Sequence, residues 1–450
     1  MVKRRLSFKE YVYVASMLFG MFFGAGNLIF PIHMGQMAGG SVWTAFVGMF
    51  ITGVGLPLLG VAALGISKST GLFDLSSKIS RPYGMFFTCL LYLTIGPFFA
   101  IPRCATVSFT VGLEQVIPES ANLKLWLFAF SLAFFGAALF FSLYPGKILT
   151  WVGKILNPCF LVFLGILVVT ALSAPSAKLS DIEPLEGYAA SPFFTGFLEG
   201  YNTMDALASL AFGIIVVQVI RGLGIEDSDA VAGNTVLSGI FSCLFMGLIY
   251  VAIALVGAQS RGALAPAANG GIAFAQVAKL HLGTAGLLVL AATVTLACLK
   301  TAVGLITSCS ETFSALFPNG PKYRAWAIIF TIGSFTFANL GLDLILEFSL
   351  PVLMFLYPLA ITLILLSLFG RFFGCDKRVY GWVTGFTLLA SVYDMLFALP
   401  IGVKAALHID GVISAVGSLL PFSDIGLGWV CPAALGLIIG LVQRRLRQAK

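Results

Sequence analysis

The sequence predicts a single all-α integral membrane domain with about 12 transmembrane helices. Of its 450 residues, 59% are hydrophobic and only 10% are charged, and the mean hydropathy is +1.00. Average soluble domains carry about 25% charged residues, so this composition excludes a soluble protein. Twelve apolar stretches are each long enough to cross a bilayer. Two of them, the first and the sixth, are interrupted near their middle by glycine, proline or polar residues.

The expected spans follow from the requirement for about 20 apolar residues per crossing. Nineteen Lys and Arg residues lie on one side of the alternating spans and five lie on the other. Because cytoplasmic loops are enriched in Lys and Arg, we expect a cell (inner) membrane protein with both termini in the cytoplasm. The net charge of +7 arises from these loops and does not indicate nucleic-acid binding. The spans are residues 9–38, 42–66, 83–112, 124–144, 147–172, 193–221, 231–258, 285–316, 323–342, 344–369, 380–402 and 424–443.

The first span contains a break around which the rest of the chain is organised. Gly24 and Gly26 each weaken a helix by about 1 kcal/mol relative to alanine, and Pro31 lacks a backbone donor. We therefore expect two half-helices, residues 9–22 and 27–38. Hydrocarbon cannot satisfy free backbone groups, so such a break has to face protein or a polar cavity. The alternative is a continuous helix with a glycine-rich packing face.

This break presents two kinds of backbone group to the same gap. The second half-helix directs the amides of Gly26 and Asn27 there, and such amides suit a carboxylate. The first half-helix leaves the carbonyls of Gly20, Phe22 and Phe23, which suit an ammonium group or a small hard cation. An amino acid carries both charges, so the break predicts an amino-acid site.

The sixth span repeats the irregularity with an acidic residue. Asp205 lies mid-span, with Asn202, Thr203 and Ser209 close by in the sequence. Breaks at corresponding places, five spans apart, indicate inverted repeats with discontinuous helices 1 and 6. We expect Asp205 to face the site, to order the unwound segment or to take part in ion coupling; the alternative is a helix N-cap. The predicted repeats are residues 9–172 and 193–369, and the appended helices are residues 380–443.

Three further ionisable residues lie inside expected spans, where such groups are functional candidates. Lys300 lies about 15 residues from either end of its span, too far to reach the interface easily. It therefore needs an anionic or carbonyl partner, or it is neutral part of the time. Arg103 stays charged, so we expect it to pair with Glu10, Asp205 or a backbone carbonyl. For Asp394, in an appended helix, we expect a structural hydrogen bond.

The rest of the sequence favours a transporter over other membrane proteins. No nucleophile–base pair, phosphate loop or C-x-x-C motif is evident, so neither an enzyme nor a cofactor is indicated. A channel would need a pore-lining ring or filter, and none is evident. The external segment 259–284 is expected to lie as a lid across the outer mouth, and residues 403–423 to rest at the membrane interface. The expected partners are a small apolar amino acid and the lipid bilayer, with no nucleic acid and no obligate protein partner.

Four motifs resemble those of the bacterial branched-chain amino acid:cation symporters, and the resemblance covers nearly the whole chain. It implies uptake of leucine, isoleucine and valine, usually coupled to sodium, with methionine as a competitor. It also implies the LeuT fold, which is the five-plus-five inverted repeat that the two breaks indicate. The motifs are Gly24-Ala25-Gly26-Asn27-Leu28-Ile29-Phe30-Pro31, Gly96-Pro97 through Ile101-Pro102-Arg103, Thr203-Met204-Asp205-Ala206, and Leu296-Ala297-Cys298 through Thr301-Ala302-Val303-Gly304-Leu305.

The same resemblance implies where an amino acid would bind. Its carboxylate would meet Ala25, Gly26 and Asn27, and its amino group would meet carbonyls near Phe22 and in residues 201–205. An apolar pocket for the side chain would be formed by Phe23, Phe98, Phe99, Met204 and Phe212. The complete predicted substrate-binding set is Phe22, Phe23, Gly24, Ala25, Gly26, Asn27, Tyr201, Thr203, Met204 and Asp205.

The resemblance also implies a cation site, from which the sequence departs at one residue. In LeuT-type sodium transporters, carbonyls and two adjacent hydroxyl side chains hold a cation between spans one and eight. Matching Thr301 to this pattern puts Lys300 where the first hydroxyl should be, and its ammonium could replace the ion. The coupling ion is therefore sodium or a proton. Alternatively, Lys300 turns away and pairs with Glu311. The expected cation-site region comprises Gly20, Phe23, Ala297, Lys300 and Thr301.

Overall fold

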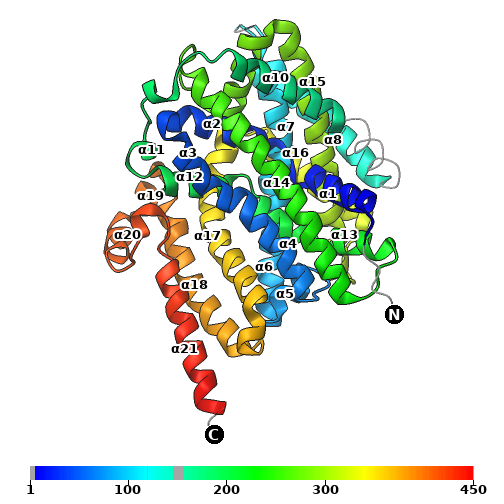
Figure 1. The fold of residues 1–450 in the computed structure, drawn as a ribbon, viewed down its shortest axis with the longest axis vertical. Coiled ribbons are helices and arrows are strands. Elements are labelled where there is room, and N and C mark those ends of the chain that lie inside the picture. Colours follow the sequence, from blue (N-terminus) through cyan, green and yellow to red (C-terminus); the bar gives the residue numbers. More distant parts are fainter. Residues whose placement is uncertain (1–5, 119, 145–156, 449–450) are drawn as a thin grey trace.

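The computed structural model describes residues 6–118, 120–144 and 157–448, and within these ranges it contains helices and no strands (Figure 1). The long helices are α1 (Phe8–Phe22), α2 (Ala25–Ala38), α4 (Leu56–Ile66), α6 (Arg81–Leu93), α7 (Ala100–Val111), α8 (Leu123–Leu143), α10 (Asn157–Ser173), α12 (Pro192–Asn202), α13 (Asp205–Gly222), α14 (Ser228–Ser260), α15 (Gly270–Leu316), α16 (Tyr323–Ala338), α17 (Leu342–Phe369), α18 (Lys377–Phe397) and α21 (Val430–Gln448). The shorter segments are η1 (Gly39–Ser41), α3 (Val42–Phe50), η2 (Ile51–Gly55), α5 (Leu72–Ser77), η3 (Thr94–Phe98), η4 (Leu113–Gln115), η6 (Leu179–Asp181), α11 (Gly187–Ala190), η7 (Gly370–Phe373), α19 (Ile401–Leu407), α20 (Asp410–Gly417) and η8 (Ser423–Ile425).

Each of the twelve expected spans contains helix. Six helical stretches among the described residues are long and apolar enough to cross a membrane alone, and two bent helix pairs would raise the number to eight. The other spans contain shorter or less apolar helices, such as α1, α10, α16 and α21. The start of the fifth expected span, residues 147–156, lies outside the described residues, as do the basic residues 3–5. The division into two repeats with appended helices stays a prediction.

Polar side chains set the starts of several helices. Ser7 precedes α1; its hydroxyl accepts a hydrogen bond from Glu10 N at 3.4 Å, and Glu10 Oε2 accepts one from Ser7 N at 2.7 Å. Asp227 and Asn269 likewise accept from backbone amides at the starts of α14 and α15. Such caps satisfy amides that a helix leaves without partners, and each contributes about 1 kcal/mol.

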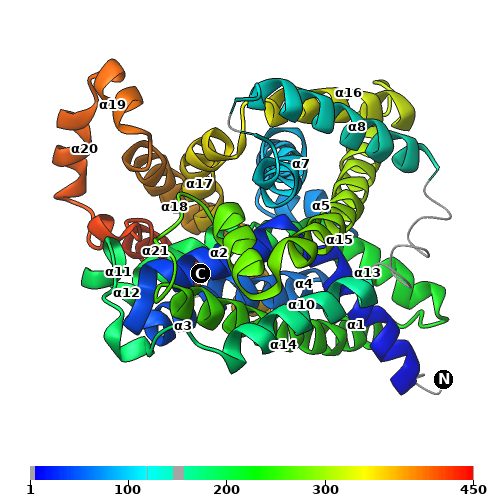
Figure 2. The ribbon, with the colours of Figure 1, turned by 90° about the horizontal axis from the view of Figure 1, so that it is seen from above.

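The two broken spans lie at the centre of the fold. The outer half of the first, α2, packs against α14 and α15, and the second half of the sixth, α13, packs against α4. Seen from above, α8 and α16 lie side by side at one edge, whereas α18, α19, α20 and α21 gather at another (Figure 2). The breaks are therefore surrounded by protein, as hydrocarbon requires of interrupted helices.

Two segments cover the side of the fold that is predicted to be extracellular. The connection between α10 and α12 is tied to the end of α2, because Leu185 N donates to Met37 O at 2.8 Å. The expected lid segment forms the first part of α15 and bends at Gly283, whose φ of 66° favours glycine. Its start packs on α2 so closely that a Cβ on Gly270 would lie 1.9 Å from Ile29 O.

Glycines also let α2 and α14 touch along their backbones. A Cβ on Gly35 would lie 2.0 Å from Ala254 O, and a Cβ on Gly257 would lie 2.1 Å from Ile32 O. Neither position has room for a side chain. In membranes, close backbone approach provides van der Waals packing that the hydrophobic effect does not supply. The outer half of the first span is therefore held against α14 as one unit.

We expect Gly257→Ala to lower the apparent melting temperature of the purified protein by several degrees, because overpacking costs about 1–3 kcal/mol. Gly233→Ala on the same helix is the matched control, since nothing lies within 4 Å of its Cβ position. The control should melt at the wild-type temperature or slightly above it. A thermal-shift measurement in detergent checks both variants, and an unchanged melting temperature in Gly257→Ala would contradict the close contact.

Candidate functional site

The break in the first span supplies one wall of the site. α1 ends at Phe22 and α2 begins at Ala25, so the predicted interruption is confirmed. α2 begins two residues earlier than expected, because Asn27 Oδ1 accepts a hydrogen bond from Gly24 N at 2.7 Å and fixes the first turn. The amides of Ala25, Gly26 and Asn27 belong to that turn, where a helix leaves N–H groups without intrahelical partners. This end of α2 also carries the positive end of the helix dipole.

The sixth span is broken at Thr203 and Met204, between α12 and α13. Met204 has a φ of 62° and a ψ of 10°, in the left-handed region, which costs a residue other than glycine about 1–2 kcal/mol. It occupies the N-cap position of α13, and Asp205 is the first helical residue. The alternative that Asp205 is the N-cap of this half-helix is therefore wrong.

A buried hydrogen-bonded cluster, the Asp205 triad of Asp205, Asn27 and Tyr250, joins the two broken spans. Asp205 Oδ2 accepts from Asn27 Nδ2 at 2.6 Å and from Tyr250 Oη at 2.8 Å. Asn27 Nδ2 also donates to Tyr250 Oη. The three side chains are 2%, 1% and 0% exposed, respectively. The carboxylate thus lies at the positive starts of both α2 and α13, and these dipoles stabilise its charge.

Arg103 reaches the break of the sixth span from α7. The third span bends at η3, where Gly96 departs from helical geometry with a φ of −87° and a ψ of −119°. Arg103 Nη1 donates to Asn202 O at 2.7 Å, and Nη2 donates to Thr203 O at 3.5 Å. The guanidinium carbon lies 5.0 Å from the centre of the Phe30 ring, a cation–π distance. The expectation that Arg103 pairs with a backbone carbonyl is confirmed, and the last carbonyls of α12 gain a cationic partner.

A cavity of about 40 Å³ lies where the two breaks meet. Of the ten residues expected to bind substrate, Phe23 and Tyr201 do not line it. Phe23 stacks on Phe19 with 4.9 Å between ring centres, and Tyr201 stacks on Tyr357 at 4.0 Å. A cavity of this size accommodates a few water molecules, so an amino acid requires the site to widen. The lining residues are Met21, Phe22, Gly24, Ala25, Gly26, Asn27, Ile95, Ala100, Arg103, Cys104, Thr203, Met204, Asp205, Ala208, Phe212, Thr301 and Leu305.

The expected cation-site region is only partly brought to this cavity. Thr301 lines the cavity, whereas Gly20, Ala297 and Lys300 do not. A Cβ on Gly24 would lie 3.1 Å from Thr301 Cγ2, so α15 touches the break of the first span directly. Thr301 Oγ1 donates to Ala297 O at 3.3 Å, and Lys300 is half-buried at the preceding position.

The apolar part of the site differs from the expected pocket. Met204 and Phe212 line the cavity as expected, but Phe98 and Phe99 do not. The ring centre of Phe98 lies 5.1 Å from that of Phe337 in α16. Phe98 belongs to the bent segment η3 and faces this neighbouring helix. The apolar and small lining residues that the sequence reasoning missed are Met21, Ile95, Ala100, Cys104, Ala208 and Leu305.

Asp394 lies away from this cavity, between two appended helices. Its side chain is fully buried in α18. One carboxylate oxygen, Oδ1, is 2.9 Å from the position that a Cβ on Gly428 would take, just before α21. α18 and α21 pack against each other, but neither carboxylate oxygen of Asp394 has a hydrogen-bond partner of accepted geometry among the described residues, so the expected structural hydrogen bond is not confirmed.

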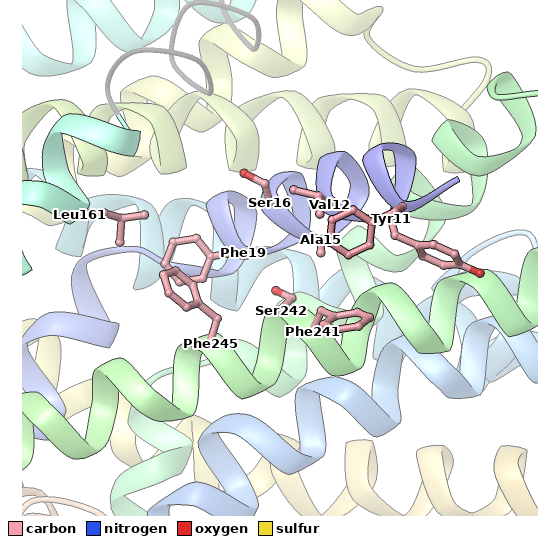
Figure 3. Close-up of a pocket in the computed structure, with 10 residues that line it drawn as sticks. Tyr11, Val12, Ala15, Ser16, Phe19, Leu161, Phe241, Ser242 and Phe245 are labelled. Atoms are coloured by element: carbon pink, nitrogen blue, oxygen red, sulfur yellow. The ribbon is translucent and has the colours of Figure 1, made fainter. Parts of the chain in front are cut away.

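A larger cavity of about 290 Å³ lies beside α1, between α1, α14 and Leu161 of α10 (Figure 3). Its polar side chains are those of Tyr11, Ser16 and Ser242, and no charged side chain of the described residues lines it. It therefore offers no counter-charge to a carboxylate or an ammonium group. The remaining lining residues are Phe8, Val12, Ala15, Phe19, Phe241 and Phe245.

Comparison with known proteins agrees with this geometry. A family model described as branched-chain amino acid transport protein matches residues 7–447. The branched-chain amino acid permease BrnQ of Lactobacillus delbrueckii subsp. lactis is 49% identical over 434 residues, covering 96% of each chain. The branched-chain amino acid permease BraB of Bacillus subtilis (strain 168) is 39% identical over 447 residues, covering 98% of this chain and 97% of its own.

Solved structures confirm the fold class. Mhp1, a nucleobase-cation-symport-1 family transporter in a closed conformation with bromovinylhydantoin bound, has a TM-score of 0.62 at 16% identity, covering 96% of this chain and 91% of its own. MhsT in complex with L-phenylalanine has a TM-score of 0.57 at 15% identity, covering 99% of both chains. The expected LeuT-type fold with discontinuous first and sixth helices is therefore confirmed.

We expect Asp205→Asn to reduce amino-acid uptake at least about tenfold while the protein still folds, so that transport is affected more than stability. An amide keeps an oxygen that can accept from Asn27 and Tyr250, but it lacks the charge that two helix starts stabilise, each by up to about 2 kcal/mol. Initial uptake rates in proteoliposomes and thermal shifts check this. Tyr250→Phe, which keeps the charge and loses one donor, should be the milder variant. Full uptake by Asp205→Asn would mean that the hydrogen bonds alone suffice.

We expect Gly26→Val to abolish substrate binding in a protein that still inserts and folds. A Cβ there would lie 2.9 Å from Arg103 Nη2 and 3.3 Å from Thr203 O, so a branched side chain would fill the cavity. Gly304→Val on α15 is the matched control, because nothing lies within 4 Å of its Cβ position. Equilibrium binding of radiolabelled amino acid distinguishes the two, and wild-type affinity in Gly26→Val would put the site elsewhere.

Proposed function

The chain belongs to the branched-chain amino acid transport protein family, and on this basis we propose that it imports leucine, isoleucine and valine as a secondary transporter. Relatives named branched-chain amino acid permease support this substrate class. The cell membrane, the inner one where there are two, is the proposed location. The excess of Lys and Arg on one side of the spans supports cytoplasmic termini.

The observation that carries this proposal is that helix starts and helix ends meet around one small cavity. The first turn of α2, which includes Gly26, offers amides to a carboxylate. Met21 and Phe22 line the same cavity at the end of α1, where helix geometry leaves carbonyls that suit an ammonium group. Arg103 and Asp205 both line this cavity, so a basic and an acidic side chain lie at a site that would bind a carboxylate and an ammonium group.

Apolar walls favour a hydrocarbon side chain on that zwitterion. Met204, Phe212 and Leu305 line the cavity beside the polar groups. Burial of each methylene contributes about 0.8 kcal/mol to binding. A difference of one methylene changes affinity by only about 1–3 kcal/mol, so we expect methionine to compete with leucine.

Contacts on the predicted outer side support an alternating-access mechanism. Arg261 Nη1 donates to Gln36 O at 2.8 Å, and Asn269 Nδ2 donates to Asp343 Oδ1 at 2.8 Å. The first bond ties α2 to the residue that follows α14, and the second ties the start of α15 to α17. Their release would open the site outwards. The break after Phe22 separates α1 from α2, so movement of α1 alone would open the site inwards.

The coupling ion of the proposed transporter is sodium or a proton. For sodium, Thr301 Oγ1 and carbonyls at the end of α1 are the available ligands, since α15 touches the break at Gly24. The alternative is sodium-independent transport, proton-coupled or facilitative, of apolar amino acids, with the Lys300 ammonium in place of the ion. Its half-buried position next to Thr301 motivates this alternative.

Leucine uptake into proteoliposomes with imposed sodium or proton gradients tests the proposed function. Uptake should saturate with leucine, and preloaded unlabelled leucine should accelerate entry of labelled leucine by counterflow. A channel gives no counterflow, so its absence would contradict a carrier. An absence of leucine uptake under every gradient would contradict the substrate class.

We expect replacement of sodium by choline, at fixed pH, to leave uptake largely unchanged if Lys300 takes the place of the ion. Lys300→Thr should then gain a response to sodium, because its hydroxyl would stand beside that of Thr301. Lys300→Met is the matched control, since it removes the same charge and supplies no hydroxyl. A large loss of wild-type uptake in choline would instead support ordinary sodium symport.

A further inference from the structure

Arg103 lies at the proposed amino-acid site, and its structural contacts do not use all of its N–H donors. Its side chain is only 3% exposed, and it lines the cavity at the two breaks. Membrane spans rarely carry a fixed charge at their centre unless that charge has a partner. The guanidinium carries five N–H donors, and its charge persists at every physiological pH.

The two sides of the guanidinium are used unequally. Nη1 makes a short bond of 2.7 Å to Asn202 O, whereas Nη2 makes a long one of 3.5 Å to Thr203 O. Nε is buried and makes no hydrogen bond within the part of the chain that the structure describes. The edge formed by Nε and Nη2 is therefore nearly unoccupied. That edge is one of the two that can bind a carboxylate through two parallel hydrogen bonds.

The unoccupied edge lies next to the start of α2. A Cβ on Gly26 would be only 2.9 Å from Arg103 Nη2 and 3.4 Å from its Cζ. The first-turn amides of α2 and the free guanidinium edge thus border the same space. A helix start by itself is a weak anion site, but a second donor that is buried and lacks a partner makes the space strongly selective for an anionic group.

We propose that Arg103 binds the substrate carboxylate through its Nε–Nη2 edge, opposite the first-turn amides of α2, while Nη1 stays anchored on Asn202 O. This rests on the proposed function and adds a residue that determines specificity for a carboxylate. Asn202 O holds the guanidinium in place, so that binding requires the cavity to widen but not the arginine to reorient.

If Arg103 served only to hold the end of α12 in place, its substitution would change ligand affinities in a different pattern. A clamp holds the broken span in shape, so its removal should weaken every ligand of the cavity alike. A carboxylate ligand discriminates between ligands, and its removal should affect only those that carry a carboxylate. The ratio of two affinities therefore separates the roles, and this ratio is insensitive to the fraction of protein that folds.

The test compares leucine with leucinamide, which keeps the ammonium group and the side chain but lacks the carboxylate. Both are measured as competitors of radiolabelled leucine on purified protein in nanodiscs, or by thermal shift where the label binds too weakly. In Arg103→Gln, the preference for leucine over leucinamide should fall about 10- to 100-fold, the usual effect of losing a charged, bidentate hydrogen bond. Arg103→Lys should lose at least tenfold, because one ammonium cannot hold Asn202 O and form a fork on a carboxylate.

Tyr92→Phe is the matched control. Tyr92 Oη donates to Ala211 O at 3.2 Å, another side-chain bond to a backbone carbonyl of the broken sixth span. Its removal should leave the preference unchanged. A preference that persists in either Arg103 variant, or that falls equally in Tyr92→Phe, would overturn the assignment. Wild-type protein that binds no leucine would refute the proposed function instead, so the two failures are distinguishable.

Discussion

The carboxylate of Asp205 accepts hydrogen bonds from Asn27 Nδ2 at 2.6 Å and from Tyr250 Oη at 2.8 Å, at the starts of two interrupted helices. A bilayer cannot hydrate the ends of a broken helix, so two breaks at this depth need protein groups or a polar cavity to satisfy their backbone. The amide of Asn27 contacts both breaks, because its oxygen accepts from Gly24 N while its nitrogen donates to Asp205. The cluster therefore joins the start of α2 to the start of α13 beside the cavity.

The helix positions could be predicted because a bilayer requires backbone groups to form hydrogen bonds within their own segment. A long apolar stretch therefore predicts a helix. The break after Phe22 was equally visible in the clustered glycines. The start of the second half-helix could not be predicted as well. The hydrogen bond from Gly24 N to Asn27 Oδ1 makes α2 begin already at Ala25. The bend at Gly96 was missed since membrane helices tolerate single glycines and prolines, and the neighbouring helices decide whether one bends.

The candidate site could be predicted where the backbone itself carries residues to the breaks, as at Gly26 and Thr203. It could not be predicted where tertiary packing turns a side chain away, as when Tyr201 stacks on Tyr357. The partner of Arg103 cannot be chosen from the sequence among Glu10, Asp205 and a backbone carbonyl, because only the folded chain brings α7 to the end of α12. Helical spacing is a signal for this placement: Ala100 lies three residues before Arg103 and four before Cys104, and all three line the cavity.

Met204 keeps a left-handed backbone, with a φ of 62°, that glycine would adopt without steric cost. Its side chain lines the cavity, so the strain of about 1–2 kcal/mol is retained together with a particular kind of surface. Methionine is unbranched, polarisable and free to rotate about three bonds, which lets it follow neighbours of different outline. We expect a deformable wall of this kind to let one cavity accept side chains branched at the β carbon and at the γ carbon alike, shapes that a stiff aromatic or β-branched wall would separate.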